Sequence, residues 1–305
     1  MRVIETLDEL VAARRVWQGK TIGLTPTMGY LHAGHRSLAQ RARAGNEIAV
    51  ASIFVNPTQF GIGEDLTRYP RDLPRDLALL EGAGVDAVFA PQAAAIYPPG
   101  FATYVEPTGP LAERLEAATR PGHFRGVATV VLKLFQLVGP TRAYFGQKDA
   151  QQLAVIRRMV ADLNLPVEIV ALPIVREADG LAMSSRNAYL NAEQRAAATA
   201  LSRALAAGRA AFDATLHADQ PGAESGDTAI QRIQAAMAQV VADEPLAMLD
   251  YAVVCDPATC ESLTQAQAPA LLAVAAKVGP ARLIDNYLLR ADGHWDEGVR
   301  VSAIA

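Results

Sequence analysis

The chain has 305 residues, of which 51% are hydrophobic and 20% charged, and its formal net charge is −4. This composition is that of an ordinary globular protein, long enough for two unequal domains. The acidic balance and the lack of a Lys/Arg run exclude a protein that binds nucleic acid mainly through phosphates. No apolar stretch is long enough to cross a membrane, so no membrane association is expected.

The cellular compartment follows from the cysteines and the first residues. Cys255 and Cys260 have no nearby histidine partner, and we interpret them as unpaired thiols in a reducing compartment. Residues 1–20 lack the continuous apolar region and the cleavage site of a secretory signal. We therefore expect a cytoplasmic protein.

The first part of the chain alternates between helical and strand patterns. Helices are predicted at 5–18, 35–43, 73–82, 127–138 and 150–163, and apolar strands at 21–25, 47–55, 87–90, 142–145 and 167–172. Such alternation is typical of parallel strands joined by right-handed helical crossovers. We predict an α/β fold whose main domain is a Rossmann-like doubly wound parallel sheet.

The pattern changes near residue 185. Helices are predicted at 192–212 and 230–243, a polar loop at 217–228, and strands at 249–255, 270–278 and 281–289. These elements predict a smaller α+β C-terminal domain. We place the boundary so that residues 1–183 form the Rossmann-like domain and residues 184–305 the small domain.

The strongest local motif is PTMGYLHAGH at residues 26–35, which follows a strand and opens a helix. A helix N-terminus at the carboxyl end of a parallel strand suits a phosphate group. His32 and His35 lie three residues apart, so both rings can donate hydrogen bonds to phosphate oxygens. A capping or structural histidine is the alternative, but the strand-to-helix context favours nucleotide binding.

Two further clusters carry phosphate-binding side chains. Residues 183–187, MSSRN, offer two hydroxyls and a guanidinium, which form a phosphate clamp unless the serines only cap a helix. Residues 146–149, GQKD, follow the strand at 142–145. There Lys148 supplies a point charge, unless it is merely solvated beside a capping Asp149.

Amide side chains end the strand at 47–55. Asn56 and Gln59, in FVNPTQFG at residues 54–61, suit a small-molecule pocket. The alternative is a buried amide bonded only to the backbone. In GHFRGV, His123 and Arg125 can contact an anion or order the pocket, although a structural role is favoured because an apolar helix follows.

Six motifs occur in this order: PTMGYLHAGH, FVNPTQFG, YPRD, GHFRGV, YFGQKD and MSSRN. Together they resemble the pantothenate synthetase (pantoate–β-alanine ligase) family, within the superfamily of nucleotidylyltransferases and class I aminoacyl-tRNA synthetases. The resemblance covers residues 25–289. It implies an AMP-forming ligase that condenses (R)-pantoate with β-alanine through a pantoyl-adenylate and releases pyrophosphate.

The resemblance also implies the site. His35 serves as proton donor, and His32 and Lys148 stabilise charge. The implied ATP site comprises Met28, Gly29, Tyr30, Leu31, His32, Ala33, Gly34, His35, Gly146, Gln147, Lys148, Asp149, Val175, Met183, Ser184, Ser185 and Arg186. Gln59, Gln152 and Asn56 are the candidates for binding pantoate and β-alanine. The small domain is expected to act as a lid, and the family implies a homodimer.

Magnesium is the expected metal, held mainly by ATP phosphates. Asp76 is the candidate acidic contact, although Arg75 stands where some relatives carry an acidic residue. The loop at 217–228 is longer than is usual in the family, and we expect it to affect the small domain rather than the chemistry.

Three other classes of function compete with the ligase. A nucleotidylyltransferase would leave a stable nucleotide conjugate instead of free AMP. An ATP-binding sensor would bind ATP without substrate-dependent release of pyrophosphate, yet the motif histidines and lysine are kept. A structural protein is disfavoured because the polar motifs stand at strand ends.

Overall fold

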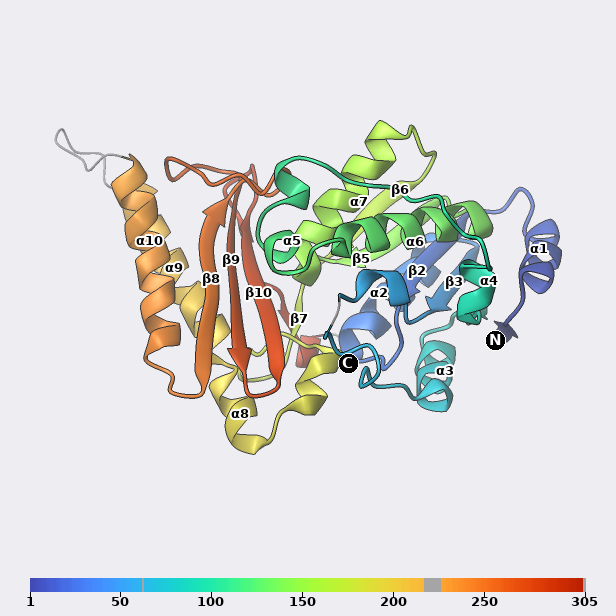
Figure 1. The fold of residues 1–305 in the computed structure, drawn as a ribbon, viewed down its shortest axis with the longest axis horizontal. Helices are drawn as coiled ribbons and strands as arrows, with labels where there is room; N and C mark the ends of the chain where they lie inside the picture. Colours follow the sequence, from blue (N-terminus) through green and yellow to red (C-terminus); the bar gives the residue numbers. More distant parts are fainter. Residues whose placement is uncertain (62, 217–225, 304–305) are drawn as a thin grey trace. The chain divides into compact units, whose positions relative to one another are not determined.

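The structure, a computed structural model, describes residues 1–61, 63–216 and 226–303 (Figure 1). The chain forms two compact units. The first comprises Met1–Gln147 and Gln152–Leu172, and the second comprises Lys148–Gln151 and Pro173–Ala305. The division after Leu172 lies before the boundary expected at 183/184, because a short strand that follows it pairs within the second unit.

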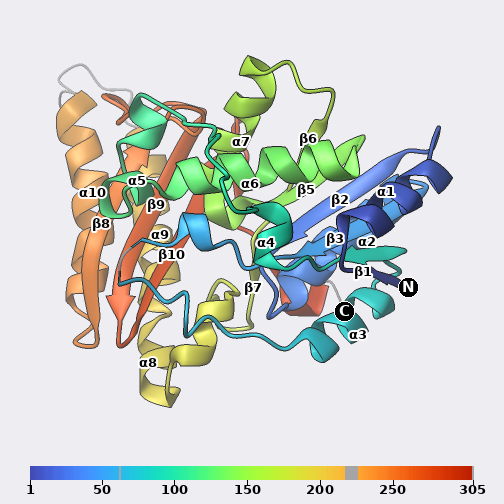
Figure 2. The same ribbon diagram turned by 45° about the vertical axis from the view of Figure 1, so that its right-hand side comes forward.

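A six-stranded sheet organises the first unit, with strand order β1-β4-β3-β2-β5-β6 (Figure 2). Its strands are β1 (Arg2–Ile4), β2 (Ile22–Thr27), β3 (Ile48–Ile53), β4 (Ala87–Phe89), β5 (Arg142–Gly146) and β6 (Glu168–Leu172). Every neighbouring pair is parallel. The chain runs from β2 outward to β3 and β4 and then returns to β5 on the other side of β2, which confirms the doubly wound topology.

Helices accompany this sheet. They are α1 (Leu7–Val16), α2 (Ala33–Gly45), α3 (Leu73–Gly82), α4 (Ala93–Ile96), α5 (Glu116–Thr119), α6 (His123–Val138) and α7 (Ala150–Asp162), with 3-10 turns η1 (Pro57–Gln59), η2 (Pro110–Ala112) and η3 (Gln147–Asp149). Helix α2 packs on β2, β3 and β5, and α1 packs on α6. Helix α6 begins at His123 rather than at the predicted residue 127, because Gly122 takes the left-handed conformation that starts it.

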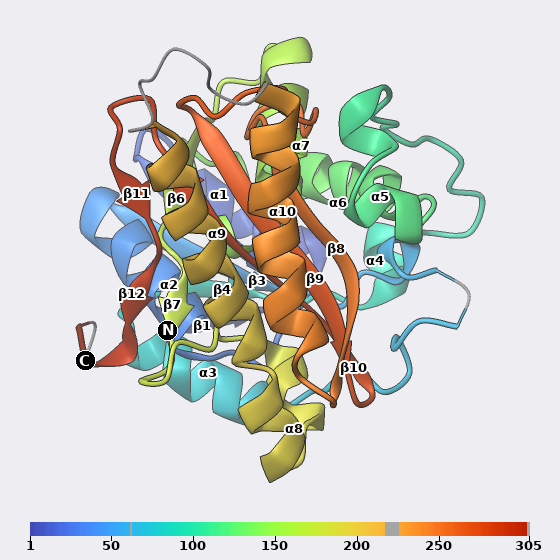
Figure 3. The ribbon, with the colours of Figure 1, turned by 90° about the vertical axis from the view of Figure 1, so that its left-hand side faces the viewer.

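The second unit is built on an antiparallel sheet of order β11-β10-β9-β8, and α9 and α10 pack against this sheet (Figure 3). Its elements are β7 (Val175–Arg176), η4 (Ser185–Tyr189), α8 (Ala192–Ala197), α9 (Ala200–Leu216), α10 (Gly226–Ala242), β8 (Ala247–Cys255), β9 (Ala270–Val278), β10 (Ala281–Leu289), β11 (Trp295–Asp296), β12 (Val299–Arg300) and η5 (Val301–Ala303). This arrangement confirms the predicted α+β character.

Two further predictions differ from the structure, and one strand was not predicted. The helix expected at 192–212 is two helices, and the break is near Thr199, whose hydroxyl donates to the carbonyl of Ala196 at 2.7 Å. Of the loop expected at 217–228, residues 217–225 lie outside the described residues and 226–228 form the first turn of α10. Strand β1 was not predicted, because three residues carry too little pattern. Among the described residues, no helix has the length and apolarity to span a membrane.

Candidate active site

The predicted nucleotide loops lie at the point where the sheet reverses its order. Strand β2 ends at Thr27, directly before Met28 and Gly29, and its neighbour β5 ends at Gly146, directly before Gln147. Both loops therefore leave the carboxyl edge of adjacent parallel strands. In open α/β sheets this is the position at which ligands bind.

The loop after β2, residues 28–32, is held by helix α3. Gly29 and Tyr30 both have positive φ, at 84° and 50°. The N–H groups of Tyr30 and Leu31 donate to the two carboxylate oxygens of Asp76, each at 2.7 Å. Arg75 also holds this loop, because its guanidinium lies over the Tyr30 ring and donates to the carbonyl of Leu31 at 3.0 Å.

Burial of Asp76 raises the pKa of its carboxyl above the usual value, although the two N–H bonds act in the opposite direction. The side chain is 1% exposed. Sequence reasoning treated Asp76 only as a metal contact, and it missed this binding to the loop. Contact with Mg²⁺ stays a prediction, and among the described residues no group of three or more His, Cys, Asp or Glu side chains is placed to hold a metal ion.

Backbone N–H groups orient the two motif histidines. Nδ1 of His32 accepts from the N–H of Gly34 at 3.2 Å, and Nδ1 of His35 accepts from the N–H of His32 at 3.3 Å. Because a backbone N–H can only donate, neither Nδ1 carries a proton, and the neutral rings are Nε2–H donors. The ring centroids are 4.1 Å apart. The capping alternative is therefore correct for both side chains, and phosphate binding through Nε2 stays a prediction.

Asn56 and Gln59 meet where β3 ends. Nδ2 of Asn56 donates to Oε1 of Gln59 at 3.0 Å and to the carbonyl of Gly126 at 3.1 Å. The hydroxyl of Tyr97 donates to Oδ1 of Asn56 at 2.8 Å. Nε2 of Gln59 lies 3.1 Å from the sulfur of Met28, so this amide lies against the loop after β2. Asn56 is engaged on both sides of its amide and supports Gln59.

A charged cluster lies behind this turn. Arg120 donates to both carboxylate oxygens of Glu64, at 2.9 and 2.7 Å. Its Nη1 is 3.0 Å from Nε2 of His123, whose Nδ1 is 2.8 Å from the carbonyl of Gln59. Burial, with a smaller effect of Arg120, lowers the pKa of His123 to about 4, so the ring is neutral at pH 7. These contacts fit the structural role that the sequence favoured for His123, and an effect on the pocket stays a prediction; Arg120 and Glu64 were missed.

The GQKD segment crosses between the two units. Gly146 and the buried Gln147 end the first segment of the first unit, and Lys148 and Asp149 belong to the second unit. Nζ of Lys148 is 3.8 Å from a carboxylate oxygen of Asp149. In the second unit, Nδ2 of Asn286 donates to the carbonyl of Lys148 at 2.9 Å, which anchors the turn.

The other predicted nucleotide contacts lie in the second unit. Val175 is buried in β7, and its carbonyl accepts from the N–H of Met183 at 2.9 Å. Ser184 caps η4, since its hydroxyl accepts from the N–H of Arg186 at 3.3 Å. The capping interpretation of this serine is therefore correct, and phosphate binding by residues 183–186 stays a prediction. Gln152, the second amide predicted to bind pantoate, lies half-buried in the first turn of α7 in the first unit.

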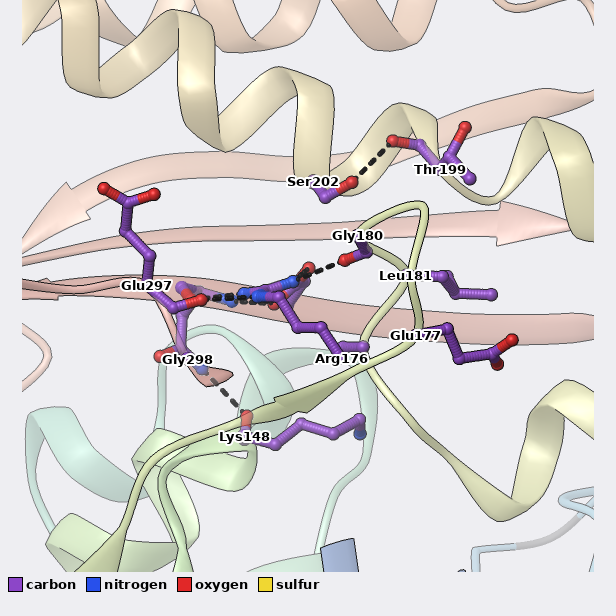
Figure 4. Close-up of polar contacts among 12 residues, drawn as sticks. Lys148, Arg176, Glu177, Gly180, Leu181, Thr199, Ser202, Glu297 and Gly298 are labelled. Atoms are coloured by element: carbon purple, nitrogen blue, oxygen red, sulfur yellow. Dashed lines mark hydrogen bonds and ion pairs between the residues drawn. The ribbon is translucent and has the colours of Figure 1, made fainter. Parts of the chain in front are cut away.

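Next to Val175, Arg176 forms a buried ion pair with Asp285 inside the second unit. Its guanidinium donates to both oxygens of Asp285, at 2.6 and 2.8 Å, and to the carbonyls of Gly180 and Glu297 (Figure 4). The carbonyl of Asn286 accepts the fifth hydrogen bond at 3.3 Å, so all five N–H groups of the guanidinium meet an acceptor, as a buried arginine requires. This arginine thus links β7, the strand that carries Val175, to β10.

Comparison with known proteins covers almost the entire chain. A family profile described as Pantoate-beta-alanine ligase matches residues 2–288. A pantothenate synthetase from Roseiflexus sp. (strain RS-1) is 59% identical over 291 residues, which are 95% of this chain and 100% of that protein.

Solved structures agree with this match. The crystal structure of pantothenate synthetase from Thermus thermophilus superposes with a TM-score of 0.87 at 50% identity, covering 94% of this chain and 98% of that one. A pantoate-beta-alanine ligase from Francisella tularensis, complexed with beta-gamma ATP and beta-alanine, gives a TM-score of 0.73 at 32% identity, covering 94% and 97%.

Proposed function

The chain belongs to the pantoate–beta-alanine ligase family, whose reaction joins pantoate to β-alanine with ATP, and we propose here which residues carry each step. The chain is an AMP-forming ligase with a pantoyl-adenylate intermediate. One contact supports this assignment of roles: Nε2 of Gln59 lies 3.1 Å from the sulfur of Met28. It places the turn proposed to bind the acid against the loop proposed to bind the nucleotide. Reaction between a bound acid and ATP needs that proximity.

In the first step, a carboxylate oxygen of pantoate attacks the α-phosphorus of ATP, and pyrophosphate leaves. We assign Gln59 and Gln152 to pantoate, with Asn56 holding Gln59 in place. His32 and His35 direct their Nε2–H groups at the triphosphate, where negative charge grows on the departing pyrophosphate. His35 is the assigned proton donor, and Lys148 contributes a point charge.

In the second step, the neutral amine of β-alanine attacks the acyl carbon of the adenylate. The carbon–nitrogen bond forms, the carbon–oxygen bond to phosphate breaks, and AMP leaves while the amine loses a proton. No covalent bond to the protein is needed, so Cys255 and Cys260 have no part. Gln59 is also assigned to the incoming amine.

The remaining nucleotide contacts are proposed from the same motifs. They are Met28, Gly29, Tyr30, Leu31, Ala33, Gly34, Gly146, Gln147, Asp149, Val175, Met183, Ser184, Ser185 and Arg186. The N–H groups of Tyr30 and Leu31 already donate to Asp76. We therefore propose that these two residues contribute to the ATP site through the shape of their backbone and not through their N–H groups.

Mg²⁺ is proposed as the ion that accompanies ATP. The described residues contain no acidic cage for it, which fits an ion bound chiefly through phosphate oxygens and water. It would neutralise triphosphate charge, with Asp76 as the candidate protein contact. A homodimer, a cytoplasmic location and a lid role for residues 184–305 are likewise proposed from the family.

Product release tests the function directly. AMP and pyrophosphate are measured with ATP and Mg²⁺ in the presence of pantoate alone, β-alanine alone, and both. Multiple turnovers of AMP release should require both substrates. Turnover with a different acid would leave the chemistry intact and refute pantoate as substrate. ATP binding without turnover on any acid would instead favour the sensor, and an accumulating nucleotide conjugate the nucleotidylyltransferase.

A further inference from the structure

Side chains from outside the turn hold the turn that carries Gln59 by binding its main chain. Gln59 is the last residue of the 3-10 turn η1, so its carbonyl lacks a partner within the turn. Two donors converge on that oxygen. Nδ1 of His123 lies at 2.8 Å and Nη2 of Arg120 at 3.3 Å.

These contacts determine the tautomer of His123. A carbonyl oxygen can only accept, so Nδ1 must carry the proton. Nη1 of Arg120 can only donate, so Nε2 at 3.0 Å must be the acceptor. The ring is 7% exposed and neutral, and each nitrogen has one defined partner.

Glu64 in turn fixes Arg120. Its carboxylate accepts two hydrogen bonds from the guanidinium, which is the planar geometry that an arginine and a carboxylate share. The pair is substantially buried, with side-chain exposures of 16% and 22%. Glu64, Arg120, His123 and the Gln59 carbonyl thus form one chain of hydrogen bonds, which we call the Gln59 clasp.

The clasp acts on the side chain of Gln59 through the main chain. The amide of Gln59 is held by Asn56 on one side and by the Met28 sulfur on the other, and neither contact reaches its carbonyl. A small displacement of the turn would move the amide away from both. A hydrogen-bonding group must keep its geometry closely to bind a small polar ligand.

We propose that His123 and Arg120 are positioning residues for pantoate, which hold the Gln59 carbonyl so that the Gln59 amide is aligned with the acid. This inference rests on the proposed role of Gln59 in binding pantoate. Neither His123 nor Arg120 is required to touch the substrate. Because Gln59 is assigned to the acid, we expect replacement of either residue to change the pantoate KM and not the ATP KM.

Two substitutions at one position separate the hydrogen bond from mere bulk. His123→Asn places an amide nitrogen near the position of Nδ1 and keeps the donor to Gln59, whereas His123→Gln places it near Nε2 and loses that donor. We expect His123→Gln to raise the pantoate KM about tenfold. His123→Asn should stay within about threefold of wild type, and the ATP KM should be unchanged in both.

Two further variants make the test decisive. Gln59→Ala should raise the pantoate KM at least as much as His123→Gln does. Arg120→Lys keeps the ion pair with Glu64 but loses the fork that reaches His123 and Gln59, so it should also raise the pantoate KM, about fivefold. It provides the same test if His123→Gln does not fold, as judged by thermal melting.

The outcomes distinguish the inference from the function beneath it. An unchanged pantoate KM in Gln59→Ala would refute the assignment of Gln59 and the clasp with it. A raised pantoate KM in Gln59→Ala, with wild-type values in folded His123→Gln and Arg120→Lys, would overturn the clasp alone. Equal rises in the KM for pantoate and ATP would also overturn it, because they indicate a general structural defect.

Discussion

Two loops leave neighbouring strands of the same sheet, yet groups of opposite character hold them. The loop after β2 is held by a carboxylate, since Asp76 accepts the N–H groups of Tyr30 and Leu31. The turn after β3 is held by donors, since His123 and Arg120 approach the carbonyl of Gln59. In both cases the holding groups are distant in sequence: Asp76 and His123 stand in the first turns of α3 and α6, and Arg120 directly follows α5.

The difference follows from which backbone groups each loop leaves unpaired. Successive residues near the left-handed region, here Gly29 and Tyr30, turn consecutive N–H groups to one side and form a site for an anion. The end of a 3-10 turn does the reverse and leaves a carbonyl open. The polarity of the holding side chain is thus dictated by local backbone conformation, before any substrate is considered.

The largest effect is expected where a loop touches the reaction. His35→Ala removes the Nε2–H donor from the loop after β2, and we expect kcat to fall about 10²- to 10⁴-fold with little change in melting temperature. Steady-state kinetics at saturating substrates measure it. The matched control is His294→Ala, an exposed histidine in the second unit, which should turn over like wild type. Near-wild-type kcat in His35→Ala would remove the histidine from the mechanism.

A second substitution inverts the polarity of the group that holds the loop after β2. Asp76→Asn has the same shape but directs an NH₂ group at one of the two backbone donors, and we expect a loss of unfolding free energy on the order of 3 kcal/mol. Urea denaturation measures it. Asp72→Asn, in the same helix, keeps a good N-cap and should change stability by less than about 0.5 kcal/mol. Equal stabilities of the two variants would contradict the role given to Asp76.

Acid should weaken the turn after β3 through His123. The pKa of His123 is about 4 in the folded state, against 6.5 unfolded, because burial and Arg120 disfavour the charged ring. The hydrogen bond to the Gln59 carbonyl, Glu116 and Glu64 act less strongly in the opposite sense. As pH falls from 6.5 to 4, His123 takes up a proton in the unfolded chain but stays neutral in the folded chain. The contribution of neutral His123 to the unfolding free energy is therefore complete above pH 6.5 and falls by up to about 3 kcal/mol over that window.

The measurement is the unfolding free energy of wild type and His123→Asn at pH 7 and pH 4.5. Wild type should lose more stability on acidification than the variant, which has no ring to protonate. Asp76 works in the opposite direction, because burial raises its pKa above 3.8 and protonation just above that value favours the folded state. An equal loss in wild type and variant would mean that His123 is not buried in neutral form.

The sequence was sufficient to predict five of the six strands of the sheet, all but β1, and which motifs follow them. Runs such as residues 47–55 are apolar because both faces of a parallel strand are covered, and the motifs' place after such strands predicted a shared edge. The holding groups were not predictable in the same way. Asp76 was recognised as acidic and relevant, but its partners are two backbone N–H groups, and a left-handed Tyr30 leaves no mark in the sequence.

Long-range pairing explains the other omissions. Glu64 and Arg120 are separated by 56 positions and meet only through the fold. Only His123 carried a signal, because it stands in a motif of its own. The observed ends of helices differ from the predicted ends because of individual residues. The left-handed conformation of Gly122 decides where α6 starts, and the hydroxyl of Thr199 decides where the helix predicted at 192–212 breaks.

The smallest expected effect tests how closely the turn after β3 packs on its helix. A Cβ at Gly126 would lie 2.4 Å from the carbonyl oxygen of Thr58 and 2.6 Å from the N atom of Gln59, both main-chain atoms that cannot move aside alone. We expect Gly126→Ala to cost about 1 to 3 kcal/mol of unfolding free energy, despite its better helix propensity. Displacement of η1 should raise the pantoate KM and leave the ATP KM unchanged.

Gly82→Ala, in α3, is the matched control, because nothing lies within 4 Å of its added Cβ and the helix should gain about 0.5 to 1 kcal/mol. Stability changes of opposite sign would show that the turn after β3 rests directly on α6, while the end of α3 is open. If Gly126→Ala stabilised the protein as Gly82→Ala does, the close approach would be wrong. If Gly126→Ala raised the ATP KM as much as the pantoate KM, the loops after β2 and β3 would not be held independently. They would then share one support, and the contrast drawn between them would be wrong.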